Sequence, residues 1–239
     1  MKSVLDKVKS AELVAKKRQW KRKGKEKVIE FDHILLALGR SPNINGFGLS
    51  ELGVKIRNNG TIQANLFLQT NISNIFVCGD SAGGNLAAVL AINSSKKMTV
   101  PVKGQILIYP CVDLTLSMRS MDIFLDGMTL TFDTMSYFIN HYLKSKEDAV
   151  NWQASPLFVD DMKNMPETYI FAAGLDPLLD EGIAYKNRLE YFGNKVTYKL
   201  YPGQIHGFLS NSKHFPKSAV CINEIGQAAQ LMAKKETLQ

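Results

Sequence analysis

The chain has 239 residues, of which 45% are hydrophobic and 21% charged. This composition is typical of a globular protein with one substantial core, and it argues against a disordered chain. The formal net charge of +7 comes from residues 1–30, which hold 11 basic and 4 acidic side chains, while the rest of the chain is neutral.

The basic run Lys16–Lys23 stands beside no nucleic-acid-binding motif. We therefore expect a solvated hairpin or chain end there, and contact with nucleic acid or an anionic surface is the alternative. Three widely spaced cysteines, Cys78, Cys111 and Cys221, argue against a disulfide framework or a zinc site and favour a reducing, cytoplasmic compartment. No signal peptide or membrane-spanning run is expected, because no apolar stretch approaches about 20 residues.

The first predicted elements are short strands. Residues 27–31 are typical of a strand, and the apolar run at 33–38 is typical of a buried one. Asn58-Asn59-Gly60 predicts a turn, followed by strand-like residues 61–64. Residues 1–74 are therefore expected to form a β-rich N-terminal segment.

Regular alternation of strands and helices begins near residue 74. The expected strands cover residues 74–78, 104–109, 169–173 and 196–200, the last ended by Pro202-Gly203. The expected helices cover residues 85–92, 131–144, 178–192 and 216–234. This alternation predicts an α/β fold, with a mostly parallel sheet and flanking helices, over residues 75–239.

The main chemical motif lies where the strand at 74–78 meets the next helix. Gly79-Asp80-Ser81-Ala82-Gly83 has the G-x-S-x-G pattern of a nucleophile elbow, in which a sharp turn lifts the serine hydroxyl clear of the sheet. The following helix directs its first N–H groups to the same point. We therefore predict Ser81 as a nucleophile and the N–H of Ala82 as an oxyanion donor.

A serine nucleophile needs a base, and the base needs an acid that orients it. His206 follows the last predicted strand, where the chain order Ser, Asp, His places the base, and it is favoured over His214. Asp176 follows the strand at 169–173, at the edge where open α/β sheets bind ligands. It is the favoured acid, and Asp113, after the previous strand, is the alternative.

Two acidic residues near Asp176 and the segment 111–165 have less specific expected roles. Asp180 and Glu181, a turn after the predicted acid, are expected to cap or solvate their helix. Residues 111–165 are expected to form a partial lid over the site. Five hydrophobic residues of this segment could line an acyl pocket, but packing within the protein is the commoner role for such residues. They are Met118, Met121, Phe124, Met128 and Phe132.

Five motifs carry a resemblance to a known family, namely Gly79–Ala88, Leu107–Pro110, Ala154–Leu157, Ala173–Gly182 and Tyr201–Phe208. In these motifs, residues 79–235 resemble the catalytic half of the hormone-sensitive-lipase-type esterases of the α/β-hydrolase fold. The resemblance implies Ser81 as nucleophile, Asp176 as acid and His206 as base, acting on small carboxylic esters with short acyl chains.

A second set of motifs lies upstream, at Phe31–Asn43, Leu52–Val54, Gly60–Ile62, Gln69–Asn71 and Asn74–Asp80. Residues 28–80 resemble the FAD-dependent pyridine-nucleotide–disulfide oxidoreductases, whose closing Gly-Asp contacts the flavin; here that residue would be Asp80. The segment lacks both G-x-G-x-x-G turns and the redox cysteine pair. We therefore expect a truncated oxidoreductase-like fragment without FAD, NAD or a metal ion.

The expected function is carboxylic ester hydrolysis. The related esterases carry a His-Gly-Gly-Gly stretch that supplies oxyanion donors, and no His-Gly pair precedes Ser81 here. Turnover is therefore expected to be impaired, unless the Gly39-Arg40 turn supplies a substitute donor. The alternatives are a non-catalytic hybrid and a remnant of an FAD/NAD oxidoreductase. A shortened sheet would also leave an open edge beside the elbow, which favours a homo-oligomer.

Overall fold

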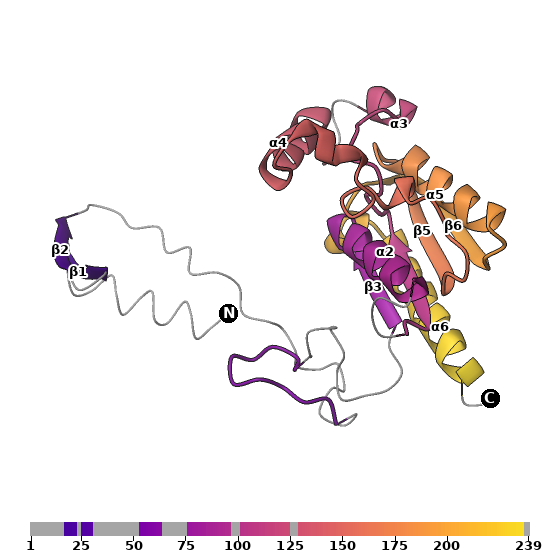
Figure 1. Ribbon diagram of the computed structural model, residues 1–239, viewed down its shortest axis with the longest axis horizontal. Coiled ribbons are helices and arrows are strands. Elements are labelled where there is room, and N and C mark those ends of the chain that lie inside the picture. The colour runs from indigo at the N-terminus through magenta and orange to yellow at the C-terminus, as the bar shows by residue number, and fades with distance from the viewer. Residues whose placement is uncertain are drawn as a thin grey trace. The chain divides into compact units, whose positions relative to one another are not determined.

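The computed structural model describes residues 17–22, 25–30, 53–63, 76–96, 101–124 and 129–236 (Figure 1). The chain divides into two compact units, residues 1–43 and 44–239. In the first unit, β1 (Lys17–Arg22) and β2 (Lys25–Glu30) pair as an antiparallel hairpin. The strand predicted at 33–38 and the domain boundary predicted at 74/75 lie outside the described residues.

The second unit contains the predicted turn at Asn58-Asn59-Gly60. The Gly60 N–H donates to the Arg57 carbonyl at 2.9 Å, which closes the turn. Ile56 and Ile62 form an isolated antiparallel bridge across it. The strand-like residues at 61–63 therefore contribute a single bridge rather than a full strand.

A four-stranded parallel sheet forms the centre of the second unit. Its strands, in spatial order, are β3 (Phe76–Asp80), β4 (Gly104–Ile108), β5 (Glu167–Leu175) and β6 (Val196–Ile205). Every neighbouring pair is parallel. The helices that cover the sheet are α2 (Ala82–Ser95), α5 (Leu179–Tyr191) and α6 (Lys217–Glu236). The predicted α/β class and its mostly parallel sheet are confirmed.

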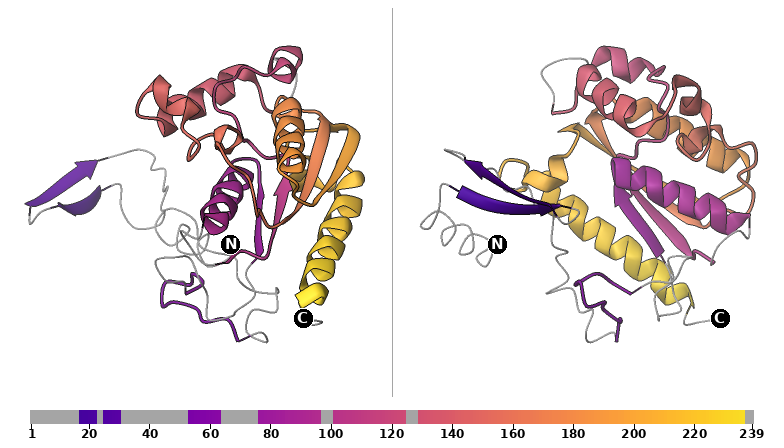
Figure 2. Two further views of the ribbon diagram at one scale, coloured as in Figure 1. Left: turned by 45° about the vertical axis from the view of Figure 1, so that its right-hand side comes forward. Right: turned by 60° about the vertical axis from the view of Figure 1, so that its left-hand side comes forward.

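Side-chain alternation along the strands divides the core into two layers. Leu107 and Ile170 pack in one buried cluster with residues of α2 and α5. Their neighbours Ile106 and Phe171 belong to a second cluster that includes residues of α6. Because successive residues of a strand point to opposite faces, the sheet is buried on both sides. Figure 2 shows α2 and α5 on one side of the sheet and α6 on the other.

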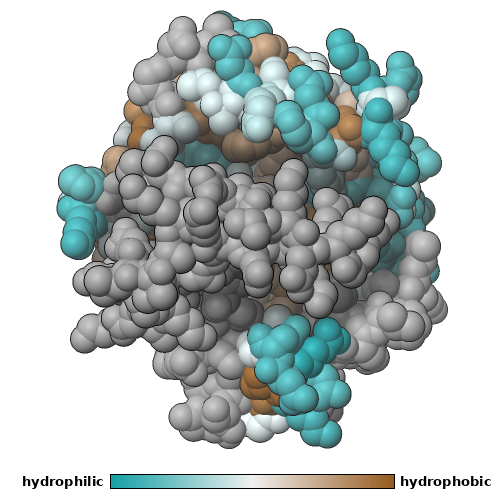
Figure 3. All heavy atoms as spheres, turned by 90° about the vertical axis from the view of Figure 1, so that its left-hand side faces the viewer, coloured by the Kyte–Doolittle hydropathy of each residue, from teal (hydrophilic) through white to brown (hydrophobic). Residues whose placement is uncertain are grey.

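A cap of short helices connects β4 to β5. It contains α3 (Arg119–Ile123), α4 (Phe132–Tyr142), η1 (Lys146–Val150) and η2 (Pro156–Phe158). A third buried cluster joins the cap to the residues that follow β4 and β5, so the cap lies at the carboxyl end of the sheet. Figure 3 shows hydrophobic residues among hydrophilic ones in this upper part of the molecule. Among the described helices, none is long and apolar enough to cross a membrane.

The structure corrects the predicted end of the last strand. β6 continues through Pro202-Gly203 to Ile205. Proline is tolerated because β6 is the outermost strand of this sheet, and its missing N–H costs least at an edge. The pairing with β5 shifts register between Ala173 and Leu175, and Gly203 takes a φ of 74°. Pro202 and Gly203 thus form an irregularity within β6 and do not end the strand.

The helix after the elbow also begins earlier than predicted, at Ala82 rather than near Asn85. Its first turn approaches the sheet so closely that two glycines are required. A Cβ on Gly79 would lie 2.1 Å from the Gly83 carbonyl oxygen, and one on Gly84 would lie 2.7 Å from the Pro110 Cβ. Gly83 is different, because its nearest neighbour would be 3.8 Å away.

Replacement of Gly83 and replacement of Gly84, which are adjacent in α2, are therefore expected to have opposite effects on stability. Gly84→Ala should lower the free energy of unfolding by about 1–3 kcal/mol, because Pro110 and α2 must separate. Gly83→Ala should be neutral or stabilising by up to about 1 kcal/mol, because alanine favours the helix. Urea unfolding of both variants measures the difference, and equal stabilities would contradict this packing.

Candidate active site

The elbow at Ser81 holds a strained backbone. Ser81 has φ 55° and ψ −120°, which is rare for a residue other than glycine. Its N–H donates to the Ile108 carbonyl of β4 at 2.9 Å, and its carbonyl accepts from the Cys111 N–H at 3.1 Å. Hydrogen bonds to two neighbouring segments thus hold the turn between β3 and α2.

Three side chains meet at the carboxyl ends of three strands. Ser81 follows β3, Asp176 follows β5, and His206 follows β6. The His206 Nε2 lies 2.9 Å from the Ser81 Oγ, and the His206 Nδ1 lies 2.8 Å from the Asp176 Oδ2. The structure therefore joins the three residues that the sequence suggested in one hydrogen-bonded line.

The surroundings of His206 fix its orientation. Asp176 is 1% exposed and His206 is 8% exposed, so little water competes for their hydrogen bond. A carboxylate can only accept, so the His206 Nδ1 carries the hydrogen and Nε2 is left to accept from the serine hydroxyl. The second Asp176 oxygen accepts from the Leu178 N–H at 2.8 Å. The Tyr109 ring packs against the imidazole, with centroids 4.7 Å apart.

The alternative acid and base lie elsewhere. His214 is exposed. Asp113 is buried, but its Oδ1 accepts from the N–H and the hydroxyl of Thr115, at 2.8 and 2.6 Å. This carboxylate therefore orders the loop after β4 and has no contact with His206.

The expected roles of Asp180 and Glu181 are wrong. Glu181 is 1% exposed, and its Oε1 accepts from the Val112 N–H at 2.6 Å and the Asp113 N–H at 3.2 Å. Burial raises the pKa of Glu181 well above its usual value, and these two hydrogen bonds oppose that shift. Asp180 accepts from the Ser120 N–H at 2.8 Å. Glu181 thus binds the loop after β4 to α5, and Asp180 binds α3 of the cap to α5. The sequence motif alone indicated neither partner.

Asn85 is a second buried polar residue whose role the sequence did not reveal. Its side-chain N–H₂ donates to the carbonyls of Cys111 and Ala154, at 2.8 and 2.7 Å. Because Asn85 is 5% exposed, loss of these partners would leave a buried donor unsatisfied. An amide within an otherwise apolar helix face is the pattern that could have indicated this role.

A cavity of about 340 Å³ lies beside Ser81. Besides Ser81, Ala82, Asn85 and Cys111, its lining is hydrophobic or aromatic, with Leu86, Leu114, Leu130, Met135, Phe138, Ile139 and Tyr142. The acyl-pocket interpretation is wrong for Met118, Met121, Phe124 and Phe132, which do not line it. Met121 is fully buried in the cap cluster instead, and Met128 lies outside the described residues.

The predicted oxyanion donor borders the same cavity. Ala82 is the first residue of α2, so its N–H has no carbonyl acceptor four residues earlier in the helix. The positive end of the helix dipole lies at the same point. The suggested substitute donor at Gly39-Arg40 lies outside the described residues.

Asp80 is the last residue of β3. Asp80 pairs with Ile108 in the β3–β4 ladder. The space over Gly79 is filled by the first turn of α2, whose Gly83 carbonyl would be 2.1 Å from a Cβ there. The Gly-Asp pair is therefore part of the elbow.

Comparison with known proteins agrees with both resemblances. Residues 58–210 match the model of a family described as alpha/beta hydrolase fold, and residues 3–101 match that of pyridine nucleotide-disulphide oxidoreductase. The chain is 35% identical over 157 residues to the carboxylic ester hydrolase LipN of Mycobacterium tuberculosis, covering 63% of this chain and 42% of LipN. It is 32% identical over 135 residues to an ethyl acetate hydrolase of Pseudomonas putida, covering 56% of this chain and 42% of that protein.

A solved structure is also similar. A hyperthermophilic esterase from Pyrobaculum calidifontis has a TM-score of 0.63 and 37% identity, over 67% of this chain and 53% of that one. The chain thus spans less than half the length of the two curated relatives. The alpha/beta hydrolase match nevertheless covers more than half of this chain. The chain belongs to the alpha/beta hydrolase fold family, and its N-terminal part is similar to the pyridine nucleotide-disulphide oxidoreductases.

Proposed function

We propose that this protein hydrolyses small carboxylic esters, with Ser81 as nucleophile, His206 as general base and Asp176 as the acid that orients it. The hydrogen-bonded line from Asp176 through His206 to Ser81 carries the proposal. Similarity to proteins named as esterases supports the same reaction class.

The first half of the reaction forms an acyl-enzyme. The Ser81 Oγ attacks the ester carbonyl carbon while the His206 Nε2 takes the hydroxyl proton. Negative charge develops on the carbonyl oxygen, to which the Ala82 N–H can donate. The tetrahedral intermediate then collapses, the ester C–O bond breaks, and His206 gives its proton to the departing alcohol oxygen.

The second half releases the acid. Water attacks the acyl carbon as the His206 Nε2 takes one of its protons. Collapse of this intermediate breaks the bond to the Ser81 Oγ, which recovers the proton from His206. Asp176 remains ionised and stabilises the imidazolium in both halves.

The cavity beside Ser81 supports an apolar substrate. Its volume of about 340 Å³ is at the small end of ligand pockets, which favours short or medium-length acyl chains. Leu86, Phe138 and Tyr142 line it and are also exposed, so the cavity opens toward solvent. An ester can therefore reach the nucleophile without displacement of the buried core.

Removal of the nucleophile tests the proposal most simply. Ser81→Ala should reduce hydrolysis of 4-nitrophenyl butyrate by about 10³-fold or more, because no other described group replaces the serine oxygen. Release of 4-nitrophenol measures the rate. Ser212→Ala, at an exposed serine, is the control and should keep the wild-type rate. Equal rates for Ser81→Ala and wild type would end the esterase proposal.

A matched pair of buried carboxylates tests the identity of the acid. Asp176→Asn should lower kcat by about 10³–10⁴-fold, because the amide favours the wrong imidazole tautomer. Asp113→Asn should retain most of the activity, since the Asp113 carboxylate accepts hydrogen bonds from Thr115 and Ser117 of its own loop. Thermal melting confirms that both variants are folded. A large loss in Asp113→Asn alone would contradict the assignment.

A further inference from the structure

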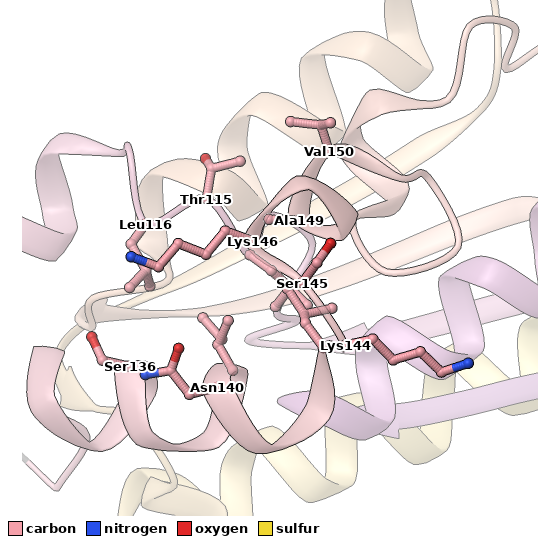
Figure 4. A pocket seen from close by; sticks show the side chains of 12 residues that line it. Thr115, Leu116, Ser136, Asn140, Lys144, Ser145, Lys146, Ala149 and Val150 are labelled. Carbon is pink, nitrogen blue, oxygen red and sulfur yellow. The ribbon is translucent and has the colours of Figure 1, made fainter.

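A second cavity lies next to the catalytic one. It has a volume of about 500 Å³ and is bordered by α4, η1 and the loop Leu114–Leu116 (Figure 4). Leu114 and Ile139 line both cavities. The two cavities are therefore neighbours on either side of the same pair of apolar side chains.

The chemistry of the second cavity differs from that of the first. Leu116, Ile139 and Leu143 give it apolar walls, as in the catalytic cavity. Its polar lining instead includes Ser136, Asn140, Ser145 and Lys146. Leu114 and Ile139 thus border both cavities, whereas lysine side chains border only the second.

Lys144 and Lys146 are the charged residues that line this space. Figure 4 shows the Lys146 side chain extending across the cavity toward Leu116 and Ser136, whereas Lys144 points its ammonium group away. No ion pair joins Lys146 to a carboxylate of the described residues. The Asp148 carboxylate accepts from the Ser145 N–H at 3.1 Å. The exposed Glu147 does not line the cavity, and hydrogen bonds from its own backbone and from Ser145, together with the charge of Lys146, lower its pKa.

We propose that the second cavity binds the anionic end of an ester substrate. One arm of the ester would extend from Ser81 past Leu114 and Ile139 and end in a carboxylate beside Lys146. The apolar walls favour the chain through buried area, and the ammonium group forms a charge-assisted hydrogen bond with its end. The substrate class is then monoesters of medium-chain dicarboxylic acids or esters of ω-hydroxy acids. This inference rests on the proposed ester hydrolysis.

Two matched substrate pairs test the proposal and identify the arm. In 4-nitrophenyl hydrogen suberate and 4-nitrophenyl octanoate, the acyl arms have equal length and differ in the terminal carboxylate. In 8-butanoyloxyoctanoate and octyl butanoate, the alcohol arms differ in the same way. The wild-type protein should prefer the carboxylate in kcat/KM for one pair, and added salt should weaken that preference.

Lysine variants then identify the binding group. Lys146 is exposed, so Lys146→Ala should reduce the carboxylate preference by only about fivefold, mainly through a higher KM for the anionic ester. Lys146→Glu should reduce it further. Lys163→Ala removes an equal charge from an exposed lysine that lines neither cavity, and it should leave the preference unchanged.

The outcomes separate this inference from the proposed function. Ser81-dependent hydrolysis of the neutral esters, with no carboxylate preference in either pair or none that depends on Lys146, would overturn the second site and leave the esterase standing. If no ester is hydrolysed, titration calorimetry on Ser81→Ala with monomethyl suberate and methyl octanoate decides. Tighter binding of monomethyl suberate, lost on adding Lys146→Ala, would support the site, and equal binding would overturn it.

Discussion

The close approach of α2 to the sheet is the constraint on which the site depends. Only glycine fits at positions 79 and 84, because the Gly83 carbonyl and Pro110 occupy the space of a side chain. This approach forces Ser81 into a backbone conformation with φ 55° and leaves its hydroxyl 2.9 Å from the His206 Nε2. Hydrogen bonds to β4 and the loop after it hold this strained backbone, so the core positions the proposed nucleophile.

The elements that position the triad were predictable because their patterns are local. β3, β5 and β6 are followed directly by Ser81, Asp176 and His206, at the edge where parallel strands place their ligands. The roles of Asn85 and Glu181 were not predictable, since each acts on backbone groups more than 25 residues away in the chain. A polar side chain comes to connect distant backbone groups in this way only when tertiary packing buries it away from solvent.

In the cap, the positions of apolar side chains were equally hard to predict from the sequence. Helical periodicity indicates α4, but it does not reveal which face meets Ser81 and which meets the core. Met135 and Ile139 contact the catalytic cavity, whereas Met121 is buried away from it. The two resemblances meet at the elbow, because the two family matches overlap at residues 58–101 and Gly79-Asp80 belongs to both patterns. In this fold that dipeptide belongs to the elbow.

The central claim is that His206 makes the Ser81 oxygen nucleophilic. Reaction with a fluorophosphonate probe tests it directly, because Ser81 attack on phosphorus forms an O–P bond and expels fluoride. Peptide mass spectrometry locates the adduct. The account predicts one phosphonate on Ser81 in the wild-type protein and none in folded His206→Ala. Folded wild-type protein with no adduct on Ser81 would contradict it.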